Sequence, residues 1–306
     1  MSDQPADLVI IGAGVAGLTA ATLAARHGLR TICLEEQMFG GLVLNIGELD
    51  PAPAARPAQG AELSAGLMEE AAEAGVTYSN DAVTRLERAG SLYRMETSGD
   101  AMLARAVVIA SGARLKPLGV PGELEFEYRG VAHCADCDAA FYAGRDAVVV
   151  GGGDSALQEA LVLARHCQTV FVVHNDALPT ARSHFVDEVA KRANIRLMPF
   201  ATVKEIRGRA EVEAVVVRGA GGDSEITCAA VFPYIGLKPN TSFLSGQVKC
   251  DTGGFVITND RLEASLDDLY AIGAVRAGFG GSLDDAFAEG ERVVEALLSK
   301  DRGGDL

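Results

Sequence analysis

The chain has 306 residues, of which 48% are hydrophobic, and its formal net charge is −15. The length favours about two domains with sizeable cores, and the acidic charge argues against nucleic acid or an anionic membrane as a partner, because their phosphates would repel it. No apolar run approaches the ~20 residues that span a bilayer. The first residues enter a predicted strand without a basic and then apolar leader, so we expect a cytoplasmic protein.

In chain order, the first predicted elements are a strand, a glycine turn and a helix. Residues 7–11 form an apolar strand, GAGVAGLTAATLAARHG reads as a helix of small residues, and residues 31–36 are a second strand that ends on acid. A loop rich in Gly, Pro and Ala follows from Gly40 to about Gly60, and ELSAGLMEEAAEAG is a helix. Residues 76–110 are predicted as short antiparallel strands.

The pattern then restarts, because DAVVVGGGDSALQEALVLARH again predicts a strand, a glycine turn and a helix. TVFVVHND is the next strand, a helix follows at about 182–193, and short strands run through VEAVVVRG and EITCAAVFPYIG. Residues 254–257 and 269–272 are strand-like, and the last helix is predicted at about 283–299. The two strand–helix–strand units predict an α/β fold with two Rossmann-like dinucleotide-binding domains.

A glycine fingerprint, GxGxxG, joins the first predicted strand to the first predicted helix. It consists of Gly12, Gly14 and Gly17. Glycines at this spacing allow a tight turn and a close approach of the backbone to a pyrophosphate at the helix N-terminus. Glu35 ends the next strand, where a carboxylate can bind the ribose of an adenosine. We predict a dinucleotide site here; the alternative is a turn that only packs helix on strand.

A second fingerprint, GxGxxA, occupies the same place in the second unit. It consists of Gly151, Gly153 and Ala156, and Asp176 follows the next strand. An acid at that position bonds a free ribose 2′-hydroxyl and repels a 2′-phosphate, so this site favours NADH over NADPH. The alternative is that Asp176 only begins a turn.

A cysteine pair, Cys134 and Cys137, stands shortly before the second fingerprint as HCADCD. Structural zinc needs four ligands, commonly from two such pairs, and His133 is poorly placed to complete a tetrahedron. We therefore predict no metal and interpret the pair as an exchangeable redox disulfide. The other cysteines are scattered singly among apolar neighbours, at Cys33, Cys167, Cys228 and Cys250.

The sequence HCADCD followed by FYAGRDAVVVGGGDSALQEA resembles the catalytic segment of the bacterial thioredoxin reductases, which are two-domain flavoprotein disulfide reductases. The opening GAGVAGLTAATLAARHGLRTICLEE, the crossing IASGARLKPLGVPGE and the return YIGLKPNTSFL are also similar, so the likeness runs nearly end to end. It implies an FAD-binding domain of residues 1–116 and 241–306, an inserted nicotinamide-nucleotide domain of residues 117–240, and a homodimer.

The resemblance also implies roles for single residues. Cys137 would lie nearer the flavin, Cys134 would attack the disulfide of a thioredoxin-like protein or a small disulfide, and Asp138 would exchange protons with the thiols. Hydride would pass from the nicotinamide to FAD, and electrons from FAD to the cysteine pair. The further cofactor-binding residues implied are Gly40, Gly41, Asn45, Gly112 and Gly273.

The chain departs from the family where NADPH is held. Asn175, Asp176 and Thr180 stand where the family has arginines, and Arg182 lies two positions late. Guanidinium groups are the natural partners of a 2′-phosphate. Their loss predicts that NADH is the better nicotinamide donor.

Three further positions depart from the family. Ala274 replaces the acid that bonds the FAD ribityl chain, and Leu42 replaces the glutamine after the glycine pair. FAD is therefore expected to be retained but supported differently. Asp136 stands between the cysteines, where a carboxylate disfavours a thiolate; the alternative is a solvated loop acid with little effect.

These residues predict an FAD-dependent, thioredoxin-reductase-like disulfide oxidoreductase. Three alternatives stay open: a member that takes electrons from ferredoxin or another carrier, an oxygen-linked dithiol oxidase, and a non-catalytic redox-sensing flavoprotein. The intact CxxCD argues against a sensor, which needs no proton relay. The intact GxGxxA argues against a carrier-linked member, which needs no such turn.

Overall fold

The computed structural model describes residues 4–49 and 52–301. The chain divides into two compact units, which we call unit 1 (Met1–Arg114 and Lys238–Leu306) and unit 2 (Leu115–Leu237). The boundaries expected from the sequence lie two and three residues further along the chain. Unit 1 is therefore discontinuous, and unit 2 is a continuous insertion.

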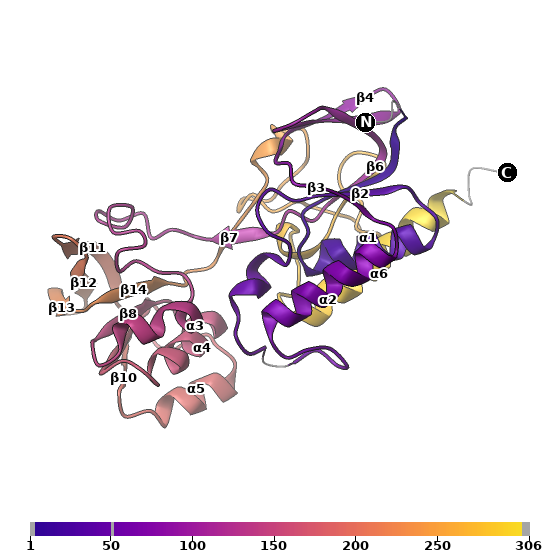
Figure 1. The fold of residues 1–306 in the computed structure, drawn as a ribbon. Coiled ribbons are helices and arrows are strands. Elements are labelled where there is room, and N and C mark those ends of the chain that lie inside the picture. Colours follow the sequence, from indigo (N-terminus) through magenta and orange to yellow (C-terminus); the bar gives the residue numbers. More distant parts are fainter. Residues whose placement is uncertain (1–3, 50–51, 302–306) are drawn as a thin grey trace. The chain divides into compact units, whose positions relative to one another are not determined.

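The main sheet of unit 1 has the strand order β3-β2-β1-β6-β5-β4, and β16 also pairs with β6. Figure 1 labels β2, β3, β4 and β6 of this sheet. Strands β1, β2, β3, β6 and β16 pair in parallel, whereas β4, β5 and β6 form an antiparallel meander. The bounds are β1 Ala6–Ile11, β2 Thr31–Leu34, β3 Thr77–Ser79, β4 Val83–Ala89, β5 Leu92–Thr97, β6 Met102–Ile109 and β16 Leu269–Ala271.

Two strand expectations need correction in unit 1. The first strand of the 76–110 segment, β3, pairs in parallel with β2 and is not part of the antiparallel meander. The stretch 254–257 is not a strand, because Val256 makes only isolated bridges, to Cys250 and Arg276. Both errors concern pairing between distant segments, which a local pattern does not specify.

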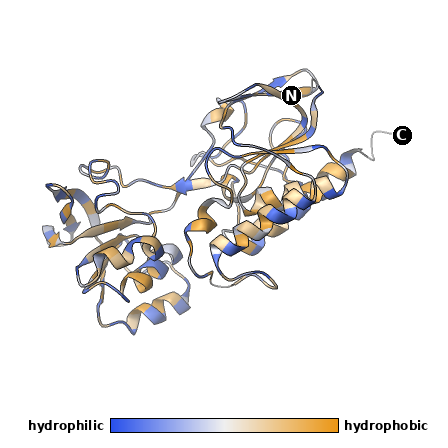
Figure 2. Ribbon diagram, viewed as in Figure 1, coloured by the Kyte–Doolittle hydropathy of each residue, from blue (hydrophilic) through white to orange (hydrophobic). Residues whose placement is uncertain are grey.

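Helices cover one face of the unit 1 sheet. Helix α1 packs against both α2 and α6. Its sequence is almost entirely small or apolar, and Figure 2 shows both hydrophobic and hydrophilic residues on the helices of this unit. Leu8 and Ile10 of β1 lie in the core under the helices, whereas Val9 and Ile11 lie in the core on the other face. In the described part of the chain, no helix is long and apolar enough to span a bilayer. The helices of unit 1 are α1 Val15–Arg26, α2 Gly60–Glu73, α6 Leu283–Asp301 and the short η1 Gly41–Asn45, η3 Ser242–Leu244 and η4 Gly273–Val275.

Unit 2 contains an all-parallel sheet of order β10-β9-β8-β14 and an antiparallel sheet of order β11-β12-β13. Val149 of β8 packs in the core with α4 and α5, and Val148 packs in the core with the antiparallel sheet. The bounds are α3 Ala135–Asp138, η2 Ala139–Tyr142, β8 Ala147–Val150, α4 Asp154–Leu163, β9 Val170–Val173, α5 Ser183–Ala190, β10 Ile195–Met198, β11 Thr202–Gly208, β12 Val212–Gly219, β13 Gly222–Thr227 and β14 Ala230–Pro233.

The two segments that connect the units, β7 (Ala113–Leu115) and β15 (Leu237–Pro239), pair with each other as a two-stranded sheet. Beside this sheet, Ser111 Oγ donates to the carbonyl oxygen of Asn240 at 2.7 Å, and Asn240 Nδ2 donates back to the Ser111 carbonyl at 2.9 Å. The outgoing and returning chains are thus held together at the boundary.

Candidate nucleotide and redox sites

In the first fingerprint, two glycines pack closely against the protein backbone and the third faces open space. A Cβ on Gly12 would collide with the carbonyl of Ala110, and a Cβ on Gly17 would collide with the carbonyl of Gly12. Gly14 has φ −77° and would place a Cβ with no heavy atom within 4 Å. Since Gly14 caps the N-terminus of α1, this open side fits a pyrophosphate that approaches the backbone.

The predicted adenosine acid lies beside this turn. Glu35 Oε2 accepts a hydrogen bond from Ala13 N at 2.8 Å, and Oε1 accepts one from Gln37 N at 3.0 Å. Gly40 N donates to the Ala13 carbonyl at 2.7 Å and forms an isolated bridge with Gly14. The structure therefore brings Glu35 and the start of the glycine pair to the same edge as the fingerprint.

The turn that lacks the family's ribityl-binding acid is supported by a buried glutamate. Glu289 of α6 is 4% exposed, and its Oε2 accepts from Gly273 N at 2.7 Å. Its Oε1 accepts from Arg276 Nε at 3.0 Å. Gly273 itself approaches α1 closely, because its Cβ would lie 3.2 Å from the Ala16 side chain. Sequence reasoning missed Glu289, since its partners lie 13 and 16 residues away.

Two other residues assigned by resemblance have less distinctive settings. Asn45 is exposed at the end of η1. Gly112 has φ +63°, a conformation that favours glycine, and its carbonyl accepts from Asn240 N at 3.0 Å. Both lie in unit 1 with the first fingerprint.

The second fingerprint repeats the geometry of the first. Gly151 has φ +138°, and a Cβ there would collide with the carbonyl of Tyr234. Gly153 has φ −87° at the N-cap of α4, and its Cβ would meet nothing within 4 Å. Ala156 is fully buried in the core. The middle glycine is again the open one, so this turn also fits a dinucleotide.

The loop after β9 folds back onto this turn. Thr180 N donates to the Gly152 carbonyl at 2.8 Å. Arg182 donates to Asp154 twice, from its backbone N at 2.7 Å and from Nε at 2.6 Å. Asp176 and the residue before it are exposed. The arginine that lies two positions late is therefore engaged by an acid in the first turn of α4.

His174, which follows β9 and precedes this loop, adds no positive charge. His174 is 3% exposed, and neither ring nitrogen has a hydrogen-bond partner among the described residues. Burial lowers the pKa of His174, although Asp176 opposes this shift. The imidazole is therefore neutral at neutral pH and is no substitute for the missing guanidinium groups.

The cysteine pair is a disulfide at the start of α3. Cys134 is the N-cap residue, and its Sγ accepts from Cys137 N at 3.1 Å. Cys134 is 7% exposed, whereas Cys137 is exposed. Among the described residues, no group of three or more His, Cys, Asp and Glu side chains is arranged to hold a metal. Helix α3 itself was not predicted from the sequence.

Small side chains pack this helix, and η2 directly after it, against α4. Ala135 and Ala139 are buried in the same core cluster as Ala156 and Ala160 of α4. Glu159 of α4 also accepts a hydrogen bond from Ala135 N, at 2.8 Å. The helix that carries the disulfide thus packs directly against the helix that follows the second fingerprint.

Asp138, the predicted proton-exchanging residue, is half-buried at the end of α3. Burial raises the pKa of its carboxyl, and the nearby His133 lowers it. His133 Nε2 in turn contacts Glu127 Oε1 at 2.8 Å. A carboxyl whose pKa is raised toward neutrality is better suited to exchange protons with thiols.

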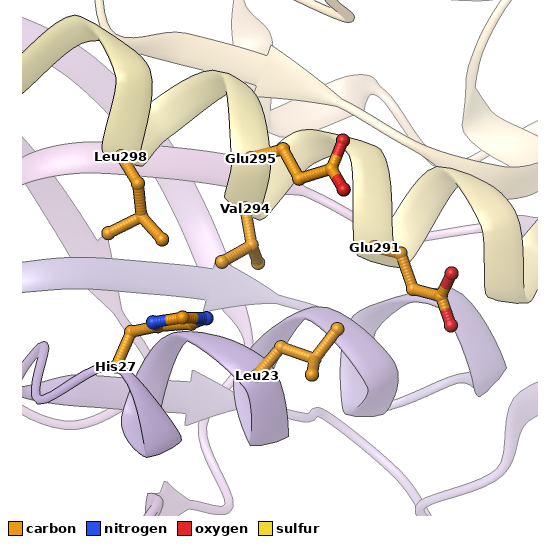
Figure 3. A pocket seen from close by; sticks show the side chains of 6 residues that line it. All are labelled: Leu23, His27, Glu291, Val294, Glu295 and Leu298. Carbon is orange, nitrogen blue, oxygen red and sulfur yellow. The ribbon is translucent and has the colours of Figure 1, made fainter.

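A shallow hollow of about 230 Å³ opens in unit 1 between α1 and α6, and Figure 3 shows the side chains that line it. His27 and Leu23 come from the C-terminal end of α1, whereas the glycine fingerprint is at its N-terminal end. The hollow therefore does not belong to the candidate nucleotide site. Its α6 residues are Glu291, Val294, Glu295 and Leu298.

Two Rossmann-like domains, of which the second carries a disulfide, are the arrangement of a flavoprotein disulfide oxidoreductase. The chain belongs to the pyridine nucleotide-disulphide oxidoreductase family, which matches residues 6–294. It is 34% identical to thioredoxin reductase of Treponema pallidum, over 96% of each chain. It is 31% identical to the 34.2 kDa protein in the rubredoxin operon of Clostridium pasteurianum, over 97% of each chain. The crystal structure of Lactococcus lactis thioredoxin reductase matches with a TM-score of 0.93 and 32% identity, over 96% of this chain and 98% of that one.

Proposed function

We propose that unit 1 binds FAD and that electrons from a reduced donor pass through it to the Cys134–Cys137 disulfide, and then to a thioredoxin-like protein or a small disulfide. The observation that carries this proposal is the disulfide itself, held at the first turn of α3 and bonded through Ala135 to the helix of the second fingerprint. A cytoplasmic location and a homodimer, both expected from the sequence, belong to the same proposal.

The residues of unit 1 fit FAD as a ligand. The open side of Gly14 would admit the pyrophosphate, and Glu35 would bond the adenosine ribose. Gly40, Gly41, Asn45, Gly112 and Gly273 would complete the site. Bound FAD would supply the two-electron chemistry that protein side chains lack. Glu289 holds Gly273 and so supports the turn in which Ala274 replaces the usual acid.

The cysteine pair and Asp138 would perform the disulfide exchange. Opening the Sγ–Sγ bond leaves two sulfur anions that need protons, and Asp138 would deliver one and recover it later. Cys134 would attack the partner disulfide. Because Cys134 is 7% exposed while its Sγ accepts from Cys137 N, the first turn of α3 must open for this attack.

We expect NADH to reduce the bound flavin with a kcat/KM at least about tenfold above that of NADPH. Each lost arginine–phosphate bond costs about 1.5–3 kcal/mol, and about 1.4 kcal/mol corresponds to a factor of ten. Asp176 would also repel a 2′-phosphate, whereas it can accept a bond from the 2′-hydroxyl of NADH. Anaerobic absorbance titrations with each nucleotide, followed by stopped-flow reduction, measure the difference.

A variant with Arg at Asn175, Asp176 and Thr180 should move the preference toward NADPH. Asp187→Arg, an exposed change on α5, controls for added positive charge and should leave the ratio unchanged. Faster reduction of the wild type by NADPH than by NADH would show that this interpretation of the loop is wrong.

A second candidate donor is a small electron-carrier protein. Two observations favour it: no arginine stands at the positions of the 2′-phosphate clamp, and a full-length relative is named after a rubredoxin operon. If neither nucleotide reduces the flavin, reduction by a chemically reduced ferredoxin or rubredoxin under anaerobic conditions supports this donor. Rapid oxygen consumption with a dithiol would instead support the dithiol oxidase.

A further inference from the structure

A glutamate of α4 lies directly beside the cysteine pair. Glu159 Oε2 accepts a hydrogen bond at 2.8 Å from Ala135 N, the amide that immediately follows Cys134. The side chain is half-buried between α4 and α3. A carboxylate bonded to the amide next to Cys134 disfavours negative charge on the Cys134 sulfur, because like charges repel each other.

The surroundings of Glu159 bring the pKa of its carboxyl close to neutrality. Burial raises the pKa of this carboxyl to about 7, and the charge of Asp136 on α3 adds to the rise. The Ala135 amide and the Tyr234 hydroxyl, which follows β14, oppose it. The Tyr234 hydroxyl is buried and lies near enough to the carboxylate to donate to it. Glu159 therefore changes charge easily.

The sulfur of Cys134 lies where a negative charge would be stabilised after reduction. It accepts the Cys137 N–H at 3.1 Å in the disulfide state, and the same bond would stabilise a thiolate once the disulfide opens. Thiols of CxxC pairs at such positions have pKa values lowered toward neutrality. A thiolate on Cys134 and a carboxylate that accepts from the amide of the next residue then titrate as a coupled pair that shares a proton.

We propose that Glu159 is a positioning residue that exchanges one proton in step with the redox state of the Cys134–Cys137 pair. This inference rests on the proposed function, which makes the two cysteines the redox pair. While the disulfide is intact, Glu159 titrates near neutrality, and its ionised form accepts from the Ala135 amide. Once the pair is reduced, Glu159 carries the proton that compensates the Cys134 thiolate.

The step balances in atoms and charge. Two electrons from the reduced flavin break the Sγ–Sγ bond and leave negative charge on both sulfurs. Asp138 gives a proton to the sulfur of Cys137 and is protonated again from solvent, while Glu159 takes a proton from solvent beside the Cys134 thiolate. At a pH above about 7, where Glu159 is ionised while the disulfide is intact, two electrons and two protons enter in total. When the thiolate attacks a partner disulfide, its charge is lost and Glu159 releases its proton.

Glu159→Gln tests the proposal, because the amide oxygen can still accept from Ala135 N while the charge and the titration are removed. The change is made in a Cys137→Ser background, which leaves Cys134 as the single thiol of the pair. The pH dependence of Cys134 alkylation by iodoacetamide is followed by mass spectrometry of its peptide. We expect Glu159→Gln to lower the apparent thiol pKa by about one unit, which is roughly tenfold more thiolate on the acid limb.

Asp187→Asn on α5 is the matched control, since it removes one exposed carboxylate of the same unit. A shift for Glu159→Gln no larger than the shift for Asp187→Asn overturns the inference. So does a result in which Glu159→Ala shifts the thiol pKa and Glu159→Gln does not, because Glu159 would then act only through its bond to Ala135.

Failure of the proposed function is detected separately. The unsubstituted chain is equilibrated with mixtures of reduced and oxidised dithiothreitol, and the state of Cys134 and Cys137 is read by alkylation. Interconversion between disulfide and dithiol supports the redox pair on which the inference rests. A pair that stays in one state throughout contradicts the proposed function, whatever the thiol pKa of the Glu159 variants.

Discussion

Replacement of Cys134 or Cys137 by serine should lower disulfide reductase turnover by more than about a thousandfold. Each cysteine is one half of the bond that accepts the electrons, and a serine hydroxyl cannot form a disulfide. Reduction of the bound flavin by its donor should continue at the wild-type rate, because that step precedes the cysteine pair. Turnover is measured with a thioredoxin-like protein, and flavin reduction is measured in a single anaerobic mixing.

Cys250→Ser is the matched control, since Cys250 is an exposed free cysteine of unit 1. It should keep full turnover. Normal turnover in either variant of the pair would remove the disulfide from the electron path. Stoichiometric zinc in the purified wild type would have the same consequence, because thiolates that hold a metal do not form a disulfide.

Gly14→Val should yield folded protein that carries no FAD. The backbone of Gly14 has φ −77°, which valine adopts, and its Cβ would meet no protein atom within 4 Å. The side chain would instead fill the space from which the pyrophosphate approaches. The ratio of flavin to protein absorbance after purification reports the loss, and circular dichroism of the flavin-free protein reports the fold.

Two other glycine substitutions separate ligand loss from misfolding. Gly17→Ala should lower the thermal stability, because its Cβ would collide with the Gly12 carbonyl. Gly153→Val makes the same change as Gly14→Val in the second fingerprint, and it should keep FAD while reduction by the nicotinamide is lost. Full flavin content in folded Gly14→Val protein would place the FAD site elsewhere.

The parts of the site that could be predicted from sequence are those set by local spacing. A glycine fingerprint between a strand and a helix needs only a few consecutive residues to specify it, and the same is true of CxxC. The structure adds that the open glycine is the middle one in both turns, Gly14 and Gly153. That distinction depends on neighbours such as Ala110 and Tyr234, which lie far away in sequence.

The residues that were missed act through tertiary contacts. Glu159 meets Ala135 across 24 residues, and Asp154, the partner of the already noted Arg182, meets it across 28. Neither pairing leaves a periodic signal, because acids and arginines on helices are usually solvated. The strand error at 254–257 has the same origin, since only the partners of Val256 decide whether its bridges extend into a ladder.

Because unit 1 is discontinuous, its last elements are synthesised only after the whole of unit 2. Strand β16 pairs with β6, and α6 packs on α1, but both follow the whole of unit 2 in the chain. Between Arg114 and the start of α6 at Leu283 a ribosome adds roughly 170 residues, which takes about 10–30 seconds. Unit 2 is continuous and can fold in that interval, while β6 still lacks β16 and α1 still lacks α6. FAD would then be loaded only at the end of synthesis, when the turn around Gly273 reaches the first fingerprint.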